Sequence, residues 1–96
     1  MKYYSYNIHS LKEPNYDHTS KACVAGHNLI LYPNLSLDEC KAKCNERSDC
    51  LAFEYGVPYG GSGGYNPKDC NLQSGANPSG CSGSHYNLDL YVKKGI

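Results

Sequence analysis

Residues 36–55 read SLDECKAKCNERSDCLAFEY, and this stretch carries the clearest structural signals of the chain. Ser36 is followed three residues later by Glu39, which is the spacing of a capping box. In that motif the serine hydroxyl accepts from the backbone N–H of the glutamate, and the glutamate carboxylate accepts from the backbone N–H of the serine. The pattern predicts a helix over residues 37–46. Acidic residues directly after the cap and basic residues toward the other end suit the helix dipole.

Two cysteines lie on one face of this predicted helix. Leu37, Cys40 and Cys44 are spaced i, i+3 and i+7, so their side chains point to the same side. We therefore expect each thiol to connect the helix to another element, and not to bond to the other.

Alternating apolar residues predict strands around the helix. Over residues 50–55, Leu51, Phe53 and Tyr55 share one face and Glu54 lies on the other. Further strands are expected at residues 27–32, 70–73 and 88–93, the last with Leu88, Leu90 and Val92 facing inward.

The two ends of the chain carry weaker patterns. Tyr4, Tyr6 and Ile8 alternate as an edge strand would, and a loop is expected from Pro14 to Ser20. Residues 74–84 have the composition of a linker. We divide the chain into an N-terminal arm or edge strand over residues 1–20 and one small α+β domain over residues 21–94.

The composition indicates a fold held by disulfides. Leu, Ile, Val and Phe number only 16 of the 96 residues, too few for a large apolar core, although ten tyrosines add buried surface. Six cysteines in so short a chain predict three disulfides, for which 15 pairings exist, and disulfides indicate a secreted protein. Zinc is the less favoured alternative: Cys40-x3-Cys44 and Cys81-x3-His85 have metal-like spacing but leave two thiols unexplained.

Signals for export are few. The first seven residues lack the apolar segment of a signal peptide, so we expect Met1 to replace a cleaved leader. Asn34-Leu35-Ser36 is an acceptor triplet for N-glycosylation, which makes Asn34 the candidate site. No run approaches the roughly 18–20 apolar residues of a membrane span.

Charge and residue chemistry exclude several function classes. Nine basic residues cancel nine acidic ones and form no stripe, which argues against nucleic acid as a partner. We expect no enzyme and no cofactor, because paired thiols supply no nucleophile and nothing links the scattered histidines to a serine and an acid. The four histidines are His9, His18, His27 and His85.

The loop over residues 56–68 is the candidate recognition surface. It holds five glycines, which are costly to order, and a long loop that persists in a small domain is often functional. Tyr59 and Tyr65 offer flat faces for a ligand. Nearby Asn66, Lys68 and Asp69 offer hydrogen bonds. The alternative is that these tyrosines only pack the loop onto the sheet.

The order of these features resembles the PAN/apple domain family. The capped helix with Cys-x-x-x-Cys, a cysteine opening the aromatic strand over 50–55, and Cys-x-Leu at 70–72 carry the resemblance, which covers residues 23–93. Residues 37–55 also resemble the leech anti-platelet proteins. Residues 87–93 are similar to PAN-like repeats of marine invertebrate extracellular proteins.

The resemblance implies a helix cradled by a curved antiparallel sheet, in an extracellular domain that binds proteins or carbohydrates without catalysis. It also implies three disulfides: Cys40–Cys70, Cys44–Cys50 and Cys23–Cys81. The loop over 56–68 departs from the family, because it is longer and richer in Gly and Tyr than the usual hairpin turn.

Carbohydrate binding of the lectin type is the first functional expectation, favoured by the Tyr/Asn/Gly loop and the near-zero charge. The alternative is a protein-binding effector of the leech anti-platelet type, with collagen or a matrix protein as ligand. Those leech proteins carry acidic tails, whereas this chain ends in Lys93-Lys94-Gly95-Ile96. A structural or assembly protein, and a homo-oligomer, stay open.

Overall fold

A computed structural model describes residues 15–58 and 65–94. Within them, five strands form one antiparallel sheet in the order β1-β5-β3-β4-β2. The strands are β1 (Tyr16–Thr19), β2 (Asn28–Tyr32), β3 (Ala52–Gly56), β4 (Cys70–Gln73) and β5 (Leu88–Lys93). Two helices accompany them: α2 (Leu37–Asn45) and α3 (Gly83–Tyr86). The fold class is therefore α+β, as expected.

The helix begins where the capping box predicts. The Ser36 hydroxyl accepts from the Glu39 N–H at 3.1 Å, and the Glu39 carboxylate accepts from the Ser36 N–H at 2.8 Å. Both contacts together satisfy two backbone donors that the first turn otherwise leaves free. These hydrogen bonds hold the pKa of Glu39 below its usual value. The helix ends at Asn45, with Glu46 as its cap.

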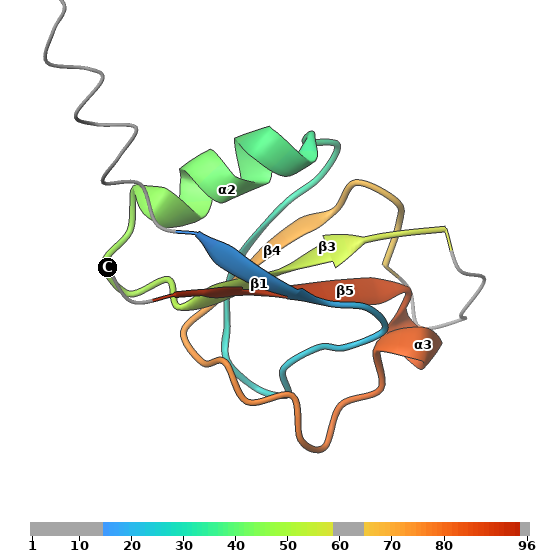
Figure 1. Cartoon of the computed structure of the whole chain (residues 1–96). Helices are drawn as coiled ribbons and strands as arrows, with labels where there is room; N and C mark the ends of the chain where they lie inside the picture. The colour runs from blue at the N-terminus through green and yellow to red at the C-terminus, as the bar shows by residue number, and fades with distance from the viewer. Residues whose placement is uncertain (1–14, 59–64, 95–96) are drawn as a thin grey trace, which may run out of the picture.

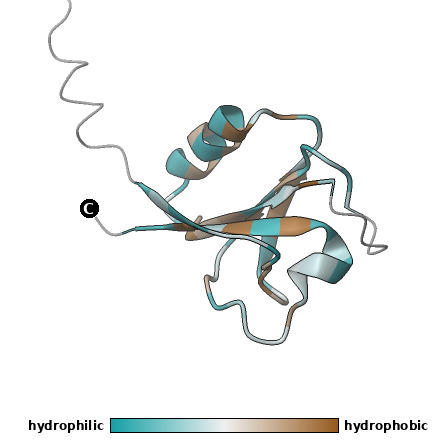
Figure 2. Ribbon diagram, turned by 45° about the vertical axis from the view of Figure 1, so that its right-hand side comes forward, coloured by the Kyte–Doolittle hydropathy of each residue, from teal (hydrophilic) through white to brown (hydrophobic). Residues whose placement is uncertain are grey.

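Both faces of the sheet are covered (Figure 1). Helix α2 packs on one face, and its buried cysteines join a cluster with Phe53, Leu72 and Tyr91. The connections between β1 and β2 and between β4 and α3 cross the other face, where Ala22, Val24, Ala52 and Leu90 pack together. In Figure 2 the hydrophobic colour runs mainly along the strands, between these two coverings.

Three disulfides cross-link these elements, and no cysteine of the chain is free. Cys40–Cys70 joins α2 to β4, and Cys44–Cys50 joins α2 to the segment that enters β3. Cys23–Cys81 joins the two connections on the opposite face. These are the three pairs that the resemblance implies.

The structure corrects two expectations at the element level. The predicted loop from Pro14 to Ser20 is wrong over Tyr16–Thr19, because these residues pair with β5 as strand β1. Residues 74–84 do not form linker throughout, because α3 begins at Gly83. Both short elements gain their order from partners distant in the sequence, which local patterns do not reveal. The edge strand expected around Tyr4, Tyr6 and Ile8 lies outside the described residues.

Candidate ligand-binding site

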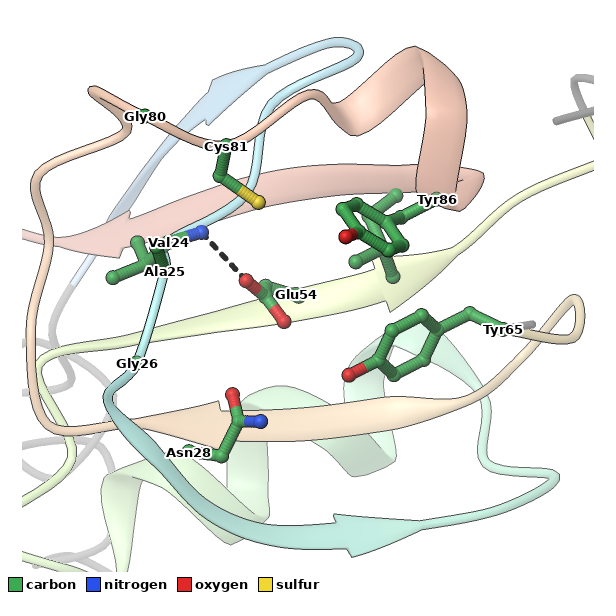
Figure 3. A pocket seen from close by; sticks show the side chains of 10 residues that line it. Val24, Ala25, Gly26, Asn28, Glu54, Tyr65, Gly80, Cys81 and Tyr86 are labelled. Atoms are coloured by element: carbon green, nitrogen blue, oxygen red, sulfur yellow. Dashed lines mark hydrogen bonds between the residues drawn. The ribbon is translucent and has the colours of Figure 1, made fainter. Parts of the chain in front are cut away.

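A pocket of about 280 Å³ lies on the face of the sheet opposite α2 (Figure 3). Its floor is strand β3, and the two connections that cross this face form part of its walls together with side chains from β2 and α3. The side chains that matter for its chemistry belong to Asn28, Glu54, Tyr65 and Tyr86. These residues come from four separate segments of the chain, so only the folded protein brings them together.

Glu54 is the central group of the floor. Its residue is only 2% exposed, on the middle strand of the sheet. One carboxylate oxygen, Oε2, accepts from the Val24 backbone N–H at 2.6 Å. The other, Oε1, accepts from the amides of Asn71 and Gln73 at 2.8 and 3.0 Å. Burial raises the pKa of Glu54, and these three hydrogen bonds act in the opposite direction.

Asn71 and Gln73 form a buried cluster with Glu54, which we call the polar floor. Both amide side chains also donate to the Asn28 Oδ1 atom, Asn71 at 3.1 Å and Gln73 at 2.6 Å. Their N–H groups are thus committed to the acceptors of Glu54 and Asn28. The Gln73 Oε1 atom is buried without a partner in the described part of the chain. The amide groups of Asn71 and Gln73 therefore hold the Glu54 carboxylate and the Asn28 side-chain oxygen in fixed positions beside the pocket.

Two tyrosines border one end of the pocket (Figure 3). The ring centroids of Tyr65 and Tyr86 are 6.2 Å apart and the planes meet at 84°, an edge-to-face arrangement. The Tyr65 hydroxyl lies 3.5 Å from the Asn71 amide nitrogen. Burial raises the pKa of Tyr65, with a further contribution from the charge of Glu54. The tyrosines thus present aromatic surface next to the polar floor.

Two close backbone approaches position these tyrosines. A Cβ on Gly56 would lie 1.9 Å from the carbonyl oxygen of Asn66, the residue after Tyr65, so only glycine lets this backbone approach the end of β3 so closely. A Cβ on Gly83 would lie 2.0 Å from the Ala22 backbone nitrogen. The first turn of α3, which carries Tyr86, therefore packs directly on the backbone that follows β1.

The five residues proposed from the sequence separate in the structure. Tyr65 borders the pocket, whereas Tyr59 lies outside the described residues. Asn66, Lys68 and Asp69 form the turn at the base of the loop and do not line the pocket. The Asp69 carboxylate accepts from the Asn66 N–H at 2.9 Å, and Lys68 has a left-handed φ of 71°. These three residues therefore shape the turn that leads back into β4.

Asn28 and Glu54 are pocket residues that sequence reasoning did not select, and Tyr86 was only the second choice there, after the loop. One signal for Glu54 was present: Glu54, Asn71 and Gln73 all alternate out of phase with the apolar positions of their strands. In a sheet with one solvated face this pattern describes exposed residues. All three are 2% exposed or less, because the connections cover the second face.

A group of potential metal ligands lies at the edge of the pocket. Within the described residues, Glu54 and the sulfur atoms of Cys23 and Cys81 lie within 4.8 Å of one another. The two cysteines are joined in a disulfide, so neither offers a thiolate. The Glu54 carboxylate is then the one remaining ligand of this group. Structural zinc sites need four ligands, so the group is not a structural zinc site.

Asn34, the glycosylation candidate, is exposed and has a φ of 60° just before the helix cap. It lies outside the set of pocket residues, so glycosylation there stays a prediction independent of the pocket.

Comparisons of the chain with protein-family models, with curated proteins and with solved structures find no match.

Proposed function

We propose that the chain is a secreted, non-catalytic recognition module of the PAN/apple type, and that it binds carbohydrate in this pocket. The observation that carries the proposal is the pairing of aromatic rings with a fixed acceptor: Tyr65 and Tyr86 line the same pocket as the Glu54 carboxylate. That carboxylate accepts three hydrogen bonds from the protein and has one acceptor position left. A sugar ring combines an apolar face of C–H groups with hydroxyl donors around its rim. Aromatic surface plus directed acceptors is the complementary arrangement.

The size of the pocket supports a small ligand group. Pockets for drug-sized ligands measure roughly 300–1,000 Å³, and this one measures about 280 Å³. One sugar ring, free or at the end of a longer glycan, fits that scale better than a large cofactor.

The disulfides support an extracellular site of action. Three bridges in 96 residues are characteristic of small proteins from oxidising compartments. They also leave no cysteine thiolate for nucleophilic chemistry. Among the described residues, no helix has both the length and the apolar character that a membrane span requires.

A glycan array tests the proposal. The oxidised protein should bind a defined subset of glycans, and the reduced and alkylated chain, which loses the fold, should bind none of them. Equal signals from the two samples would reject carbohydrate binding.

A protein ligand is the second candidate function. Strand β2 lies at an edge of the described sheet, and it exposes Ile30 and Leu31, at 38% and 46%. Apolar side chains on an edge strand favour contact with another protein. A panel of collagens and other matrix proteins, run beside the glycan array, separates this function from the first.

A further inference from the structure

Glu54 is a buried carboxylate that forms no ion pair within residues 15–58 and 65–94. None of the ion pairs between described residues involves Glu54, and its partners there are one backbone N–H and two neutral amides. A buried charge is costly unless it is paired or well hydrogen-bonded, so this arrangement leaves part of the charge uncompensated.

The hydrogen bonds that Glu54 receives favour its ionised form and oppose the effect of burial, which raises its pKa. Val24, Asn71 and Gln73 all donate to it. A carboxylate has about four acceptor positions, so three donors leave room for one more. The pocket is where that fourth donor can come from, because Glu54 itself lines the pocket.

The rings beside Glu54 suit a cation as well. Tyr65 and Tyr86 both line the pocket, and the faces of tyrosine rings attract an ammonium group placed within about 6 Å of the ring centre. An ammonium group that enters here gains a charged hydrogen bond at the floor and aromatic surface at the side. A neutral hydroxyl gains a hydrogen bond to the carboxylate but no attraction between opposite charges.

We propose that the sugar recognised by this pocket carries a free, protonated amine, and that Glu54 selects it by binding the ammonium group. The ligand class is a hexosamine that is not N-acetylated. This inference rests on the proposed carbohydrate-binding function and specifies its ligand. An acetylated amine is neutral and larger, and a sugar with a carboxylate or sulfate is repelled by Glu54.

Three oligosaccharides of equal length and linkage test the ligand side: an oligomer of glucosamine, its fully N-acetylated form and an oligomer of glucose. Isothermal titration of the oxidised full chain measures the three affinities. We expect the glucosamine oligomer to bind at least about tenfold more tightly than the other two, since an ammonium group adds the attraction of opposite charges, which a hydroxyl on the same carboxylate lacks.

Two variants test the protein side. Glu54→Gln keeps the shape and removes the charge, and it should abolish the preference for the amine. Glu46→Gln removes one negative charge at the exposed cap of α2, far from the pocket residues, and should leave the preference intact. If Glu54→Gln does not fold, the wild-type comparison of free with acetylated amine still decides the proposal.

The possible outcomes distinguish a failure of the amine inference from a failure of the proposed carbohydrate binding. Equal or tighter binding of the acetylated or glucose oligomer overturns the amine inference and leaves carbohydrate binding standing. A preference that persists in Glu54→Gln overturns the role of Glu54. Binding of lysine-rich peptides, but of no saccharide, overturns both proposals and assigns the pocket to a protein partner.

Discussion

The ammonium nitrogen of Lys93 donates a hydrogen bond of 3.0 Å to the carbonyl oxygen of Cys44, at the C-terminal end of helix α2. A second contact of 3.3 Å reaches the carbonyl oxygen of Arg47. The last carbonyls of a helix have no partner within the helix, and they carry its negative end. Lys93 therefore connects strand β5 to the end of the helix.

Replacement of this lysine should weaken the fold. Lys93→Met keeps most of the apolar stem and removes the charged donor, and we expect the free energy of unfolding to fall by about 1 kcal/mol. Lys94→Met is the matched control, because the Lys94 side chain makes an exposed ion pair of 3.4 Å with Asp17 and the substitution leaves the backbone unchanged. Urea denaturation measures both. An equal decrease in the free energy of unfolding for both variants would show that the contact between Lys93 and the helix end does not stabilise the fold.

The helix cap allows a second prediction. Ser36→Ala removes the hydroxyl that accepts from Glu39, and should destabilise the protein by about 1 kcal/mol. Ser48→Ala, at an exposed position in the turn after α2, should change the melting temperature little. Since Ser36 lies outside the pocket, ligand binding should be unchanged in the folded protein.

The three disulfides should differ in their contribution. The chain-entropy model makes a bridge more stabilising when it closes a longer loop. The sequence separations are 58 for Cys23–Cys81 and 6 for Cys44–Cys50. Replacing the first pair with serines should therefore cost about 4 kcal/mol and the second about 2 kcal/mol, by thermal or urea unfolding. A larger loss of stability for Cys44–Cys50 than for Cys23–Cys81 would mean that packing in the folded state, and not loop length, determines how much each disulfide stabilises the protein.

The two tyrosines should matter for binding more than for stability. Tyr65→Ala and Tyr86→Ala each remove aromatic surface from the pocket, and we expect affinity for the array-identified glycan to fall by about 1–3 kcal/mol. Tyr65→Phe retains the ring and should lose less. Tyr32→Ala is the control, because Tyr32 packs against the cluster on the α2 face. Normal binding by both pocket variants would place the ligand elsewhere.

Glu54 should give the protein an unusual pH dependence. Burial raises its pKa in the folded state above the unfolded value of about 4.3, so the folded state holds the proton more tightly. Its contribution to stability is then fully present below the unfolded pKa and is lost as the pH rises through the folded pKa. The wild type should therefore gain stability relative to Glu54→Gln as the pH is lowered from 7 toward 4.

Urea titrations of the two proteins at a series of pH values measure this difference. Groups whose pKa is lowered, such as Glu39 and Asp49, destabilise the fold in acid, but they act equally in both proteins and cancel. A difference that stays constant with pH would contradict a raised pKa for Glu54.

Most of the secondary structure around the helix followed from local patterns. The capping box predicted the start of α2 at Leu37, an apolar run before a turn predicted β2, and alternation predicted β3 to β5, all within two residues. These signals are local because a cap and an alternating strand involve neighbours in the sequence. Strand β1 carries no such signal, since it exists through its pairing with β5.

The pocket could not be predicted in the same way. The sequence pointed to aromatic and hydrogen-bonding residues near Tyr65, and Tyr65 does border the pocket. Its partners Asn28, Glu54 and Tyr86 come from distant segments, and their proximity depends on strand order and register. From residue type alone, Asp69 and Glu54 are equivalent carboxylates. The Asp69 carboxylate, however, accepts a hydrogen bond from the Asn66 N–H within the turn.

A small α+β fold with six cysteines, a capped helix and several strands could be predicted from the sequence, because each of these depends on residue type and local spacing. The covering of the second face of the sheet could not be predicted, since it follows from the packing of distant segments. That covering buries Glu54 beneath the connections that Cys23–Cys81 joins, and it turns a strand residue that looked solvent-facing into the charged centre of a pocket. The physical reason is that burial depends on which distant segments cross a face, and alternation along one strand carries no information about them.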